Sequence, residues 1–110
     1  MKVSMLILAG AALVAAGAAQ ADDDAKALLQ KSGCTACHAI DKKLVGPAYN
    51  DVSTKYKGDA GAAAKLAEKV KKGGQGVWGP VPMPPNANVK DDDIKKMVAY
   101  VLALKLQNIW

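Results

Sequence analysis

The chain has 110 residues, with 15 lysines and no arginine against 10 acidic residues, and its formal net charge is +5. A moderate charge made only of lysine argues against nucleic-acid binding, because arginine is the side chain that most often reads bases. It fits encounter with an acidic protein partner better. Phe is absent and aromatic residues make up 5% of the chain, so side chains alone would build only a thin core in one small domain.

The first 21 residues have the features of a secretory signal peptide. Met1-Lys2 is a short basic start, residues 3–18 are almost wholly apolar, and Ala19-Gln20-Ala21 offers small residues at both cleavage-determining positions. An uncleaved membrane anchor is the alternative, but the Ala and Gly content makes this run weakly hydrophobic. We therefore expect cleavage after Ala21 and a single mature domain, residues 22–110, with 89 residues and a charge of +4 once Lys2 is lost. We also expect it in the periplasm, as a monomer without stable membrane insertion.

Apolar spacing in the mature chain predicts an all-helical domain without a sheet. The predicted helices cover residues 22–33, 48–56, 60–72 and 91–106, and Asp59 is expected to cap the third. Their apolar faces consist of Ala25, Leu28 and Leu29; Tyr49, Val52 and Tyr56; Ala63, Leu66, Ala67 and Val70; and Ile94, Met97, Val98, Val101, Leu102 and Lys105. Two longer loops are predicted, residues 39–47 and 73–88, and the second holds four of the five prolines.

Cys34-Thr35-Ala36-Cys37-His38 directly follows the first predicted helix. Two thiols three positions apart, followed by an imidazole, are typical of the attachment site of a c-type haem. Cys34 and Cys37 would form thioethers to the two porphyrin vinyl groups, and His38, the only histidine in the chain, would face the iron. The alternatives are a redox dithiol, which needs a βαβ setting and a low-pKa first thiol, and half of a zinc site, for which the other ligands are missing.

The second axial ligand decides between an electron carrier and an open site for a small molecule. Met, Lys, Tyr or a vacant position are the candidates, because no second histidine exists. Met97 lies on the apolar face of the last helix, where packing in the core is the ordinary role. Met83 lies in Val81-Pro82-Met83-Pro84-Pro85, and the flanking prolines give a stiff, extended segment that suits a thioether ligand.

Four segments resemble the short bacterial class I cytochromes c of the cytochrome c-551 type. They are Gly33-Cys34-x-x-Cys37-His38, Val45-Gly46-Pro47-Ala48-Tyr49, Gly76-Val77-Trp78-Gly79 and Val81-Pro82-Met83-Pro84-Pro85-Asn86. The resemblance covers essentially the whole mature chain. It implies an all-α cytochrome c fold, with four to five short helices around one covalently bound haem c and with the first and last helices crossing.

The resemblance also implies roles for single residues. His38 and Met83 match the axial ligands, and Pro47 matches the residue whose carbonyl accepts the proton on the far nitrogen of the ligand histidine. Trp78 matches a hydrogen-bond donor to a haem propionate, with core packing as the alternative. Asn86 matches a residue near the ligand sulfur. Lys69 stands where relatives often carry Arg or His to hold a propionate, and Tyr100 where they often carry Trp in the helix crossing.

These features predict a periplasmic one-electron carrier rather than an enzyme. By resemblance, it would take electrons from a membrane cytochrome complex and pass them to a nitrite reductase, a terminal oxidase or a cytochrome c peroxidase. Five lysines are candidates for a ring around the exposed haem edge: Lys31, Lys42, Lys43, Lys71 and Lys72. A haem-based ligand-binding protein or sensor with an open sixth site, and a haem-free thiol oxidoreductase, are the alternatives.

Overall fold

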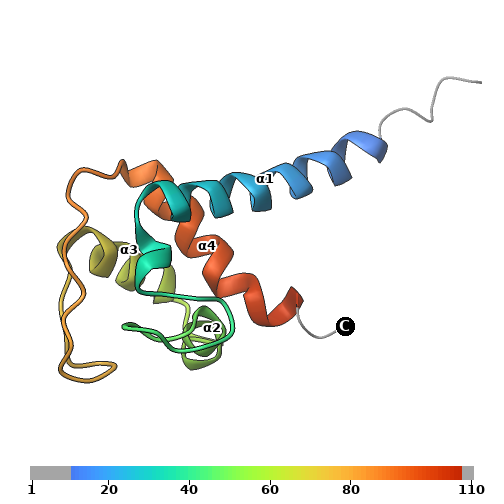
Figure 1. The fold of residues 1–110 in the computed structure, drawn as a ribbon. Helices are drawn as coiled ribbons and strands as arrows, with labels where there is room; N and C mark the ends of the chain where they lie inside the picture. Colours follow the sequence, from blue (N-terminus) through green and yellow to red (C-terminus); the bar gives the residue numbers. More distant parts are fainter. Residues whose placement is uncertain (1–10, 108–110) are drawn as a thin grey trace, which may run out of the picture.

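The computed structural model describes residues 11–107, with side chains described for residues 21–104. These residues form four α-helices and one 3-10 helix, and the arrangement of the α-helices is drawn in Figure 1. Their bounds in chain order are α1 Ala11–Lys31, η1 Cys34–Ala36, α2 Tyr49–Lys55, α3 Ala62–Lys72 and α4 Asp91–Gln107. Within this described range no strand forms, and β-type backbone pairing is limited to two isolated bridges. The all-α prediction is confirmed.

Helix α4 is the centre of the packing, because it contacts α1, α2 and α3. Its N-terminal part crosses α1, as predicted (Figure 1). Asp91, Asp92 and Asp93 lie in its first turn, where negative charge stabilises the positive end of the helix dipole. The predicted apolar face is buried at Ile94, Met97, Val98 and Val101, together with Tyr100 and Leu104; Leu102 is half-buried, and the side chain of Lys105 lies outside the described ones.

The first helix is longer than predicted. It begins at Ala11 rather than Asp22, because the residues before Asp22 are mostly Ala, the best helix former, and nothing stops the helix there. Ala25 and Leu29 are buried and Leu28 is partly buried against the same core, so the predicted apolar face is confirmed. Residues 1–10 of the predicted signal peptide lie outside the described residues.

The third helix differs in its start and in one face residue. It begins at Ala62, and the Asp59 side chain accepts a hydrogen bond from the Gly61 N–H at 2.9 Å instead of capping the helix. This contact is a turn formed by an aspartate with its own following backbone. Ala62 is buried and Ala63 is exposed, so the face is rotated slightly from the predicted one. Leu66, Ala67 and Val70 pack against the core as expected.

Candidate haem-binding site

The two cysteines and the histidine of the C-x-x-C-H motif lie on one tight turn. Gly33 has a φ of 79°, in the left-handed region, and directs the chain from α1 into η1. The Cys37 and His38 N–H groups both donate to the Cys34 carbonyl, at 3.2 and 3.0 Å. Both thiols are free and, with His38, line one cavity. This turn therefore brings the predicted attachment residues to a single wall.

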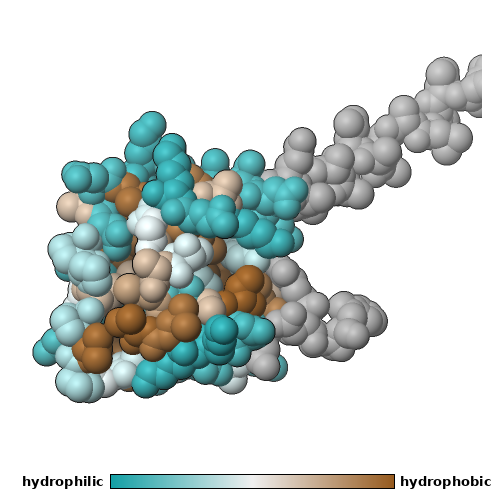
Figure 2. Space-filling model, in the orientation of Figure 1, coloured by the Kyte–Doolittle hydropathy of each residue, from teal (hydrophilic) through white to brown (hydrophobic). Residues whose placement is uncertain are grey.

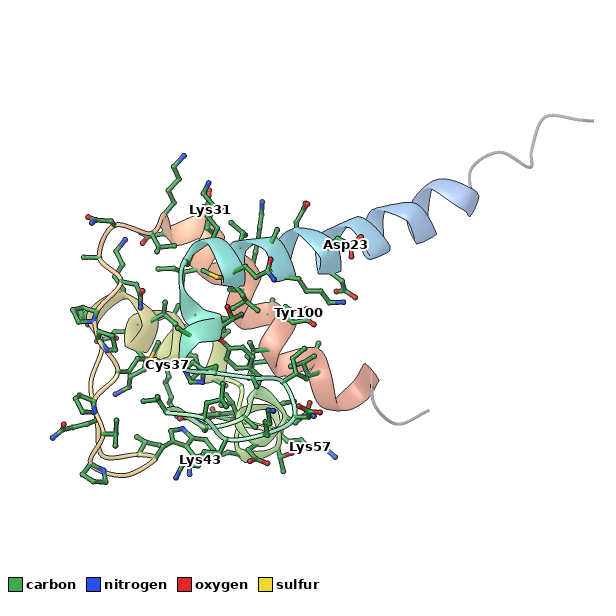
Figure 3. All side chains as sticks on the ribbon, viewed as in Figure 1. Asp23, Lys31, Cys37, Lys43, Lys57 and Tyr100 are labelled. Carbon is green, nitrogen blue, oxygen red and sulfur yellow. The ribbon has the colours of Figure 1, made fainter. Side chains whose placement is uncertain are left out.

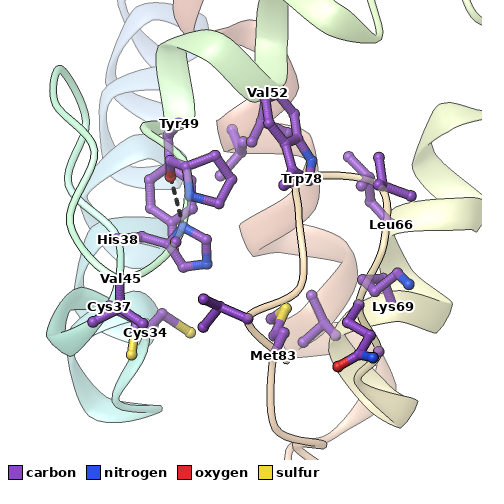
Figure 4. A pocket seen from close by; sticks show the side chains of 18 of the residues that line it. Cys34, Cys37, His38, Val45, Tyr49, Val52, Leu66, Lys69, Trp78 and Met83 are labelled. Carbon is purple, nitrogen blue, oxygen red and sulfur yellow. Dashed lines mark hydrogen bonds between the residues drawn. The ribbon is translucent and has the colours of Figure 1, made fainter.

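His38 is fixed by contacts on several sides (Figure 4). Its Nδ1 lies 2.8 Å from the Pro47 carbonyl oxygen; because a carbonyl can only accept, Nδ1 carries the proton and Nε2 has the free lone pair. The Tyr49 ring stacks on the imidazole, with centroids 4.8 Å apart and planes 18° from parallel. A Cβ on Gly46 would lie 2.6 Å from His38 Cε1, so only glycine fits there. The imidazole is therefore oriented, with Nε2 available to a metal.

The protonation of Cys34 argues against a redox dithiol. Burial raises the pKa of the Cys34 thiol, and a hydrogen bond with the Tyr49 side chain offsets only part of that shift. Burial also raises the pKa of the Tyr49 phenol, so both groups are neutral at pH 7. Thiol–disulfide exchange needs a thiolate, and the described chain offers no βαβ unit. The free thiols suit alkylation by a vinyl group better.

Met83 lies across the cavity from His38, on the loop between α3 and α4 (Figure 4). We call residues 80–86 the strap. The Met83 N–H donates to the Gly74 carbonyl at 2.8 Å, and the Gly74 N–H donates to the Met83 carbonyl at 3.0 Å. Met97, on α4, also lines the cavity but is only 3% exposed and belongs to the core cluster.

The cavity between these walls has a volume of about 610 Å³, within the roughly 300–1,000 Å³ common for cofactor sites. It reaches from the motif to the strap and extends into the core at Leu29, Val98 and Val101. Large apolar side chains stay exposed at its edge, among them Leu44, Val45, Val77 and Val81; apolar surface of this kind lies along the lower edge of the molecule in Figure 2. The shape, lining and donor set fit one haem.

Trp78 lines the cavity and is 42% exposed, so it is not a residue of the protein core. The Lys55 ammonium lies over its ring, 5.5 Å from the centroid. No hydrogen bond of the indole N–H is found within the described residues, and its donation to a propionate stays a prediction.

Asn86 holds the C-terminal end of the strap. Its side-chain amide donates to the carbonyls of Val70, at 3.1 Å, and Pro84, at 3.3 Å. Its backbone N–H donates to the same Val70 carbonyl at 3.0 Å. Asn86 therefore ties the strap to the end of α3, and its predicted contact with the ligand sulfur stays a prediction.

Of the five lysines predicted to surround the haem edge, only Lys43 lines the cavity, and the ring itself stays a prediction. Lys31, in the last turn of α1 (Figure 3), does not line it. Lys71 donates to the Val89 carbonyl at 2.8 Å and pairs with Asp91 at 3.0 Å, and Lys72 pairs with Glu68. Lys42 is exposed but does not line the cavity either. Lys69, at the position where relatives often carry Arg or His to hold a propionate, also lines the cavity.

The comparisons with known proteins agree with this site. The family model described as "Cytochrome c" matches residues 23–105. The chain belongs to the cytochrome c family. It is 52% identical over 99 residues to the cytochrome c-551 of Pseudomonas aeruginosa, covering 90% of this chain and 92% of that one. It is 50% identical over 97 residues to the cytochrome c-552 of Nitrosomonas europaea, covering 88% and 91%.

The crystal structure of wild-type Nitrosomonas europaea cytochrome c552 is similar, with a TM-score of 0.70 and 47% identity over 72% of this chain and 98% of that one. The predicted short class I cytochrome c and its fold are therefore confirmed. Membership and the Cys34-x-x-Cys37-His38 spacing give the cofactor, one covalently bound haem c. The family also assigns the chain to the electron-carrying cytochromes.

Two features that carry the site were absent from the sequence-based prediction. The stacking of Tyr49 on His38 joins residues 11 apart in the chain, and no helical or motif spacing indicates it. The Gly74–Met83 bridge is hidden because Gly73-Gly74 is also the ordinary signal for a helix end.

Proposed function

We propose that the chain is a one-electron carrier in which His38 and Met83 are the two axial ligands of the haem iron. The observation that carries this proposal is the arrangement of the two side chains on opposite walls of one apolar cavity, with His38 Nδ1 already bonded to Pro47. When bound, the haem supplies a one-electron couple at its iron, and a thioether ligand raises its potential. The residues around the cavity exclude water and hold both ligands in either redox state.

Tests with carbon monoxide separate this proposal from a haem sensor with an open sixth site. We expect the reduced wild-type protein to bind carbon monoxide poorly at neutral pH, because Met83 occupies the position. The Met83→Ala variant should bind it readily. Ready binding to the wild-type protein, unchanged in Met83→Ala, would support the open site instead.

Export to the periplasm is part of the same proposal. Only 72% of this chain covers 98% of the matched solved structure, which supports a haem domain shorter than the full chain and, with it, the proposed cleavage after Ala21. In the part of the chain that the structure describes, no helix has the length and apolar content to cross a bilayer. Mass spectrometry of the exported holoprotein should give a chain that begins at Asp22. A chain that begins at Met1 would contradict cleavage.

The proposed partners are redox proteins: a membrane cytochrome complex as donor, and a nitrite reductase, terminal oxidase or cytochrome c peroxidase as acceptor. Lys43 and Lys69, at the cavity, are the best candidates to attract an acidic partner. We expect Lys43→Glu/Lys69→Glu to slow bimolecular electron transfer at low salt, with the difference shrinking at high salt. Lys72→Glu is the matched control, because Lys72 pairs with Glu68 outside the cavity. Equal rates for all three proteins would exclude these lysines from the interface.

A further inference from the structure

The end of α3 lies unusually close to the strap. Gly73, the residue that follows α3, has a φ of 73°. A Cβ added to it would lie 2.5 Å from the Met83 carbonyl oxygen, 2.8 Å from Pro85 N and 3.0 Å from Pro84 C. All three are backbone atoms, which cannot move aside as a flexible side chain would. Glycine is therefore required here by a close approach of two backbones as well as by its φ.

The backbone of Met83 depends on one pair of hydrogen bonds. Pro82, Pro84 and Pro85 have no N–H group, so Met83 has the only backbone donor between residues 82 and 85. That donor bonds to the Gly74 carbonyl, and the Gly74 N–H bonds back to Met83. The register of the methionine is thus set by its pairing with Gly74, just after the end of α3.

We infer that Gly73 is a positioning residue for the iron's sixth ligand: it lets the strap approach α3 closely enough for Gly74 to pair with Met83. This inference rests on the proposed function, which makes Met83 that ligand. Gly73 touches neither the cofactor nor the reacting atoms and acts only through the strap. Its effect should therefore appear in how firmly the thioether holds its position against a competing ligand.

Gly73→Ala in the ferric holoprotein tests this inference, with imidazole as the competing ligand. The added methyl group would push the strap away from α3. We expect the apparent affinity for imidazole to rise about tenfold or more, equivalent to about 1.4 kcal/mol. Gly58→Ala is the matched control: Gly58 has a φ of 80°, but a Cβ there meets nothing within 4 Å. Gly58→Ala has the same energetic cost of placing alanine at a positive φ, but its methyl group clashes with no other atom. Its imidazole affinity should therefore stay near the wild-type value.

Equal imidazole affinities in the Gly73→Ala and Gly58→Ala variants would overturn the inference, whether both rise or neither does. Failure of the proposed function is a different result: in that case Met83→Ala itself would leave imidazole binding unchanged.

Amide hydrogen exchange on the wild-type holoprotein provides a test that does not depend on folding of a variant. The Met83 amide should exchange at least about tenfold more slowly than that of Val81, which has no such bridge. Equal exchange rates at the two positions would contradict the bridge and the inference with it.

Discussion

The two walls of the haem cavity hold their ligands by different means. On one wall, the His38 ring is fixed by the Pro47 carbonyl and by the stacked Tyr49 ring, and the short motif turn fixes its backbone. On the other wall, Met83 is held through its backbone alone, by a single bridge to Gly74 between prolines. The histidine wall also carries the covalent link to the cofactor. The comparison indicates that the methionine wall is the weaker one, where a competing ligand or a rise in temperature acts first.

The largest effect is expected from removal of the covalent link on the histidine wall. Cys34→Ser/Cys37→Ser should give no haem that survives acid denaturation and extraction. The resulting polypeptide should be largely unfolded, because the cavity of about 610 Å³ extends into a core without Phe. Far-UV circular dichroism during heating checks this. A cooperative transition in haem-free protein would show that the helices hold together without the cofactor.

Crowding of His38 gives the next largest effect. In Gly46→Ala the new methyl group would meet the imidazole at 2.6 Å from Cε1, and overpacking of this kind costs about 1–3 kcal/mol. Denaturant unfolding of the holoprotein should therefore show a loss of this size. Gly61→Ala is the control, because its Cβ would meet only side-chain atoms at 3.5 Å or more. Equal stability of the two variants would mean that the histidine wall is less rigid than its contacts indicate.

Weakening the attachment of the strap at its C-terminal end, Asn86, should have a smaller effect. Asn86→Ala removes the side-chain donor to Val70 and Pro84, at about 0.5–1.5 kcal/mol per hydrogen bond. We expect unfolding free energy to fall by about 1–2 kcal/mol, and imidazole to compete more easily with Met83. Asn88→Ala serves as the control because Asn88 is exposed. If imidazole competes no better with Asn86→Ala than with Asn88→Ala, this anchor does not reach the ligand.

The smallest effect lies outside both walls, at Asp59. A hydrogen bond with Lys65, followed by one from the Gly61 N–H, lowers the pKa of the Asp59 carboxyl. A carboxyl whose folded pKa is depressed stabilises the fold above its unfolded pKa, and that contribution is lost as pH falls through the folded pKa. Asp59→Asn should remove this part of the acid dependence, seen as a slightly flatter melting temperature between neutral and acid pH. An unchanged slope would show that the ion pair with Lys65 is not formed in solution.

The two walls also differ in how well the sequence predicts them. The histidine wall lies within 16 residues, from Cys34 to Tyr49, and local spacing predicts its attachment motif, Cys34 to His38. The Pro47 contact was implied only by the resemblance, and no spacing indicates the stacking of Tyr49. The last helix was predictable because the buried residues of α4 form a continuous apolar face. The predicted helix start at Asp22 applies to the cleaved chain; in the uncleaved chain α1 begins at Ala11, since Ala-rich sequence continues a helix without a stop signal.

The strap was predictable only in part. Its prolines indicated a stiff segment and favoured Met83 as a ligand. Its attachment to α3 was not predictable, because the bridge joins residues nine apart through backbone atoms, which carry no side-chain signature. The contacts of the lysines were not predictable for a related reason. Lys71 contacts Val89 and Asp91 because the connection between α3 and α4 brings these residues next to it. Sequence alone does not define the path of that connection.

The most direct test is the thioether-to-iron charge-transfer band of the ferric holoprotein. The band should be present at neutral pH in the wild-type protein and in Met97→Leu, since Met97 belongs to the core. It should be absent from Met83→Leu, which conserves volume but has no sulfur. A band that survives in Met83→Leu, or disappears only in Met97→Leu, would contradict the assignment of the sixth ligand.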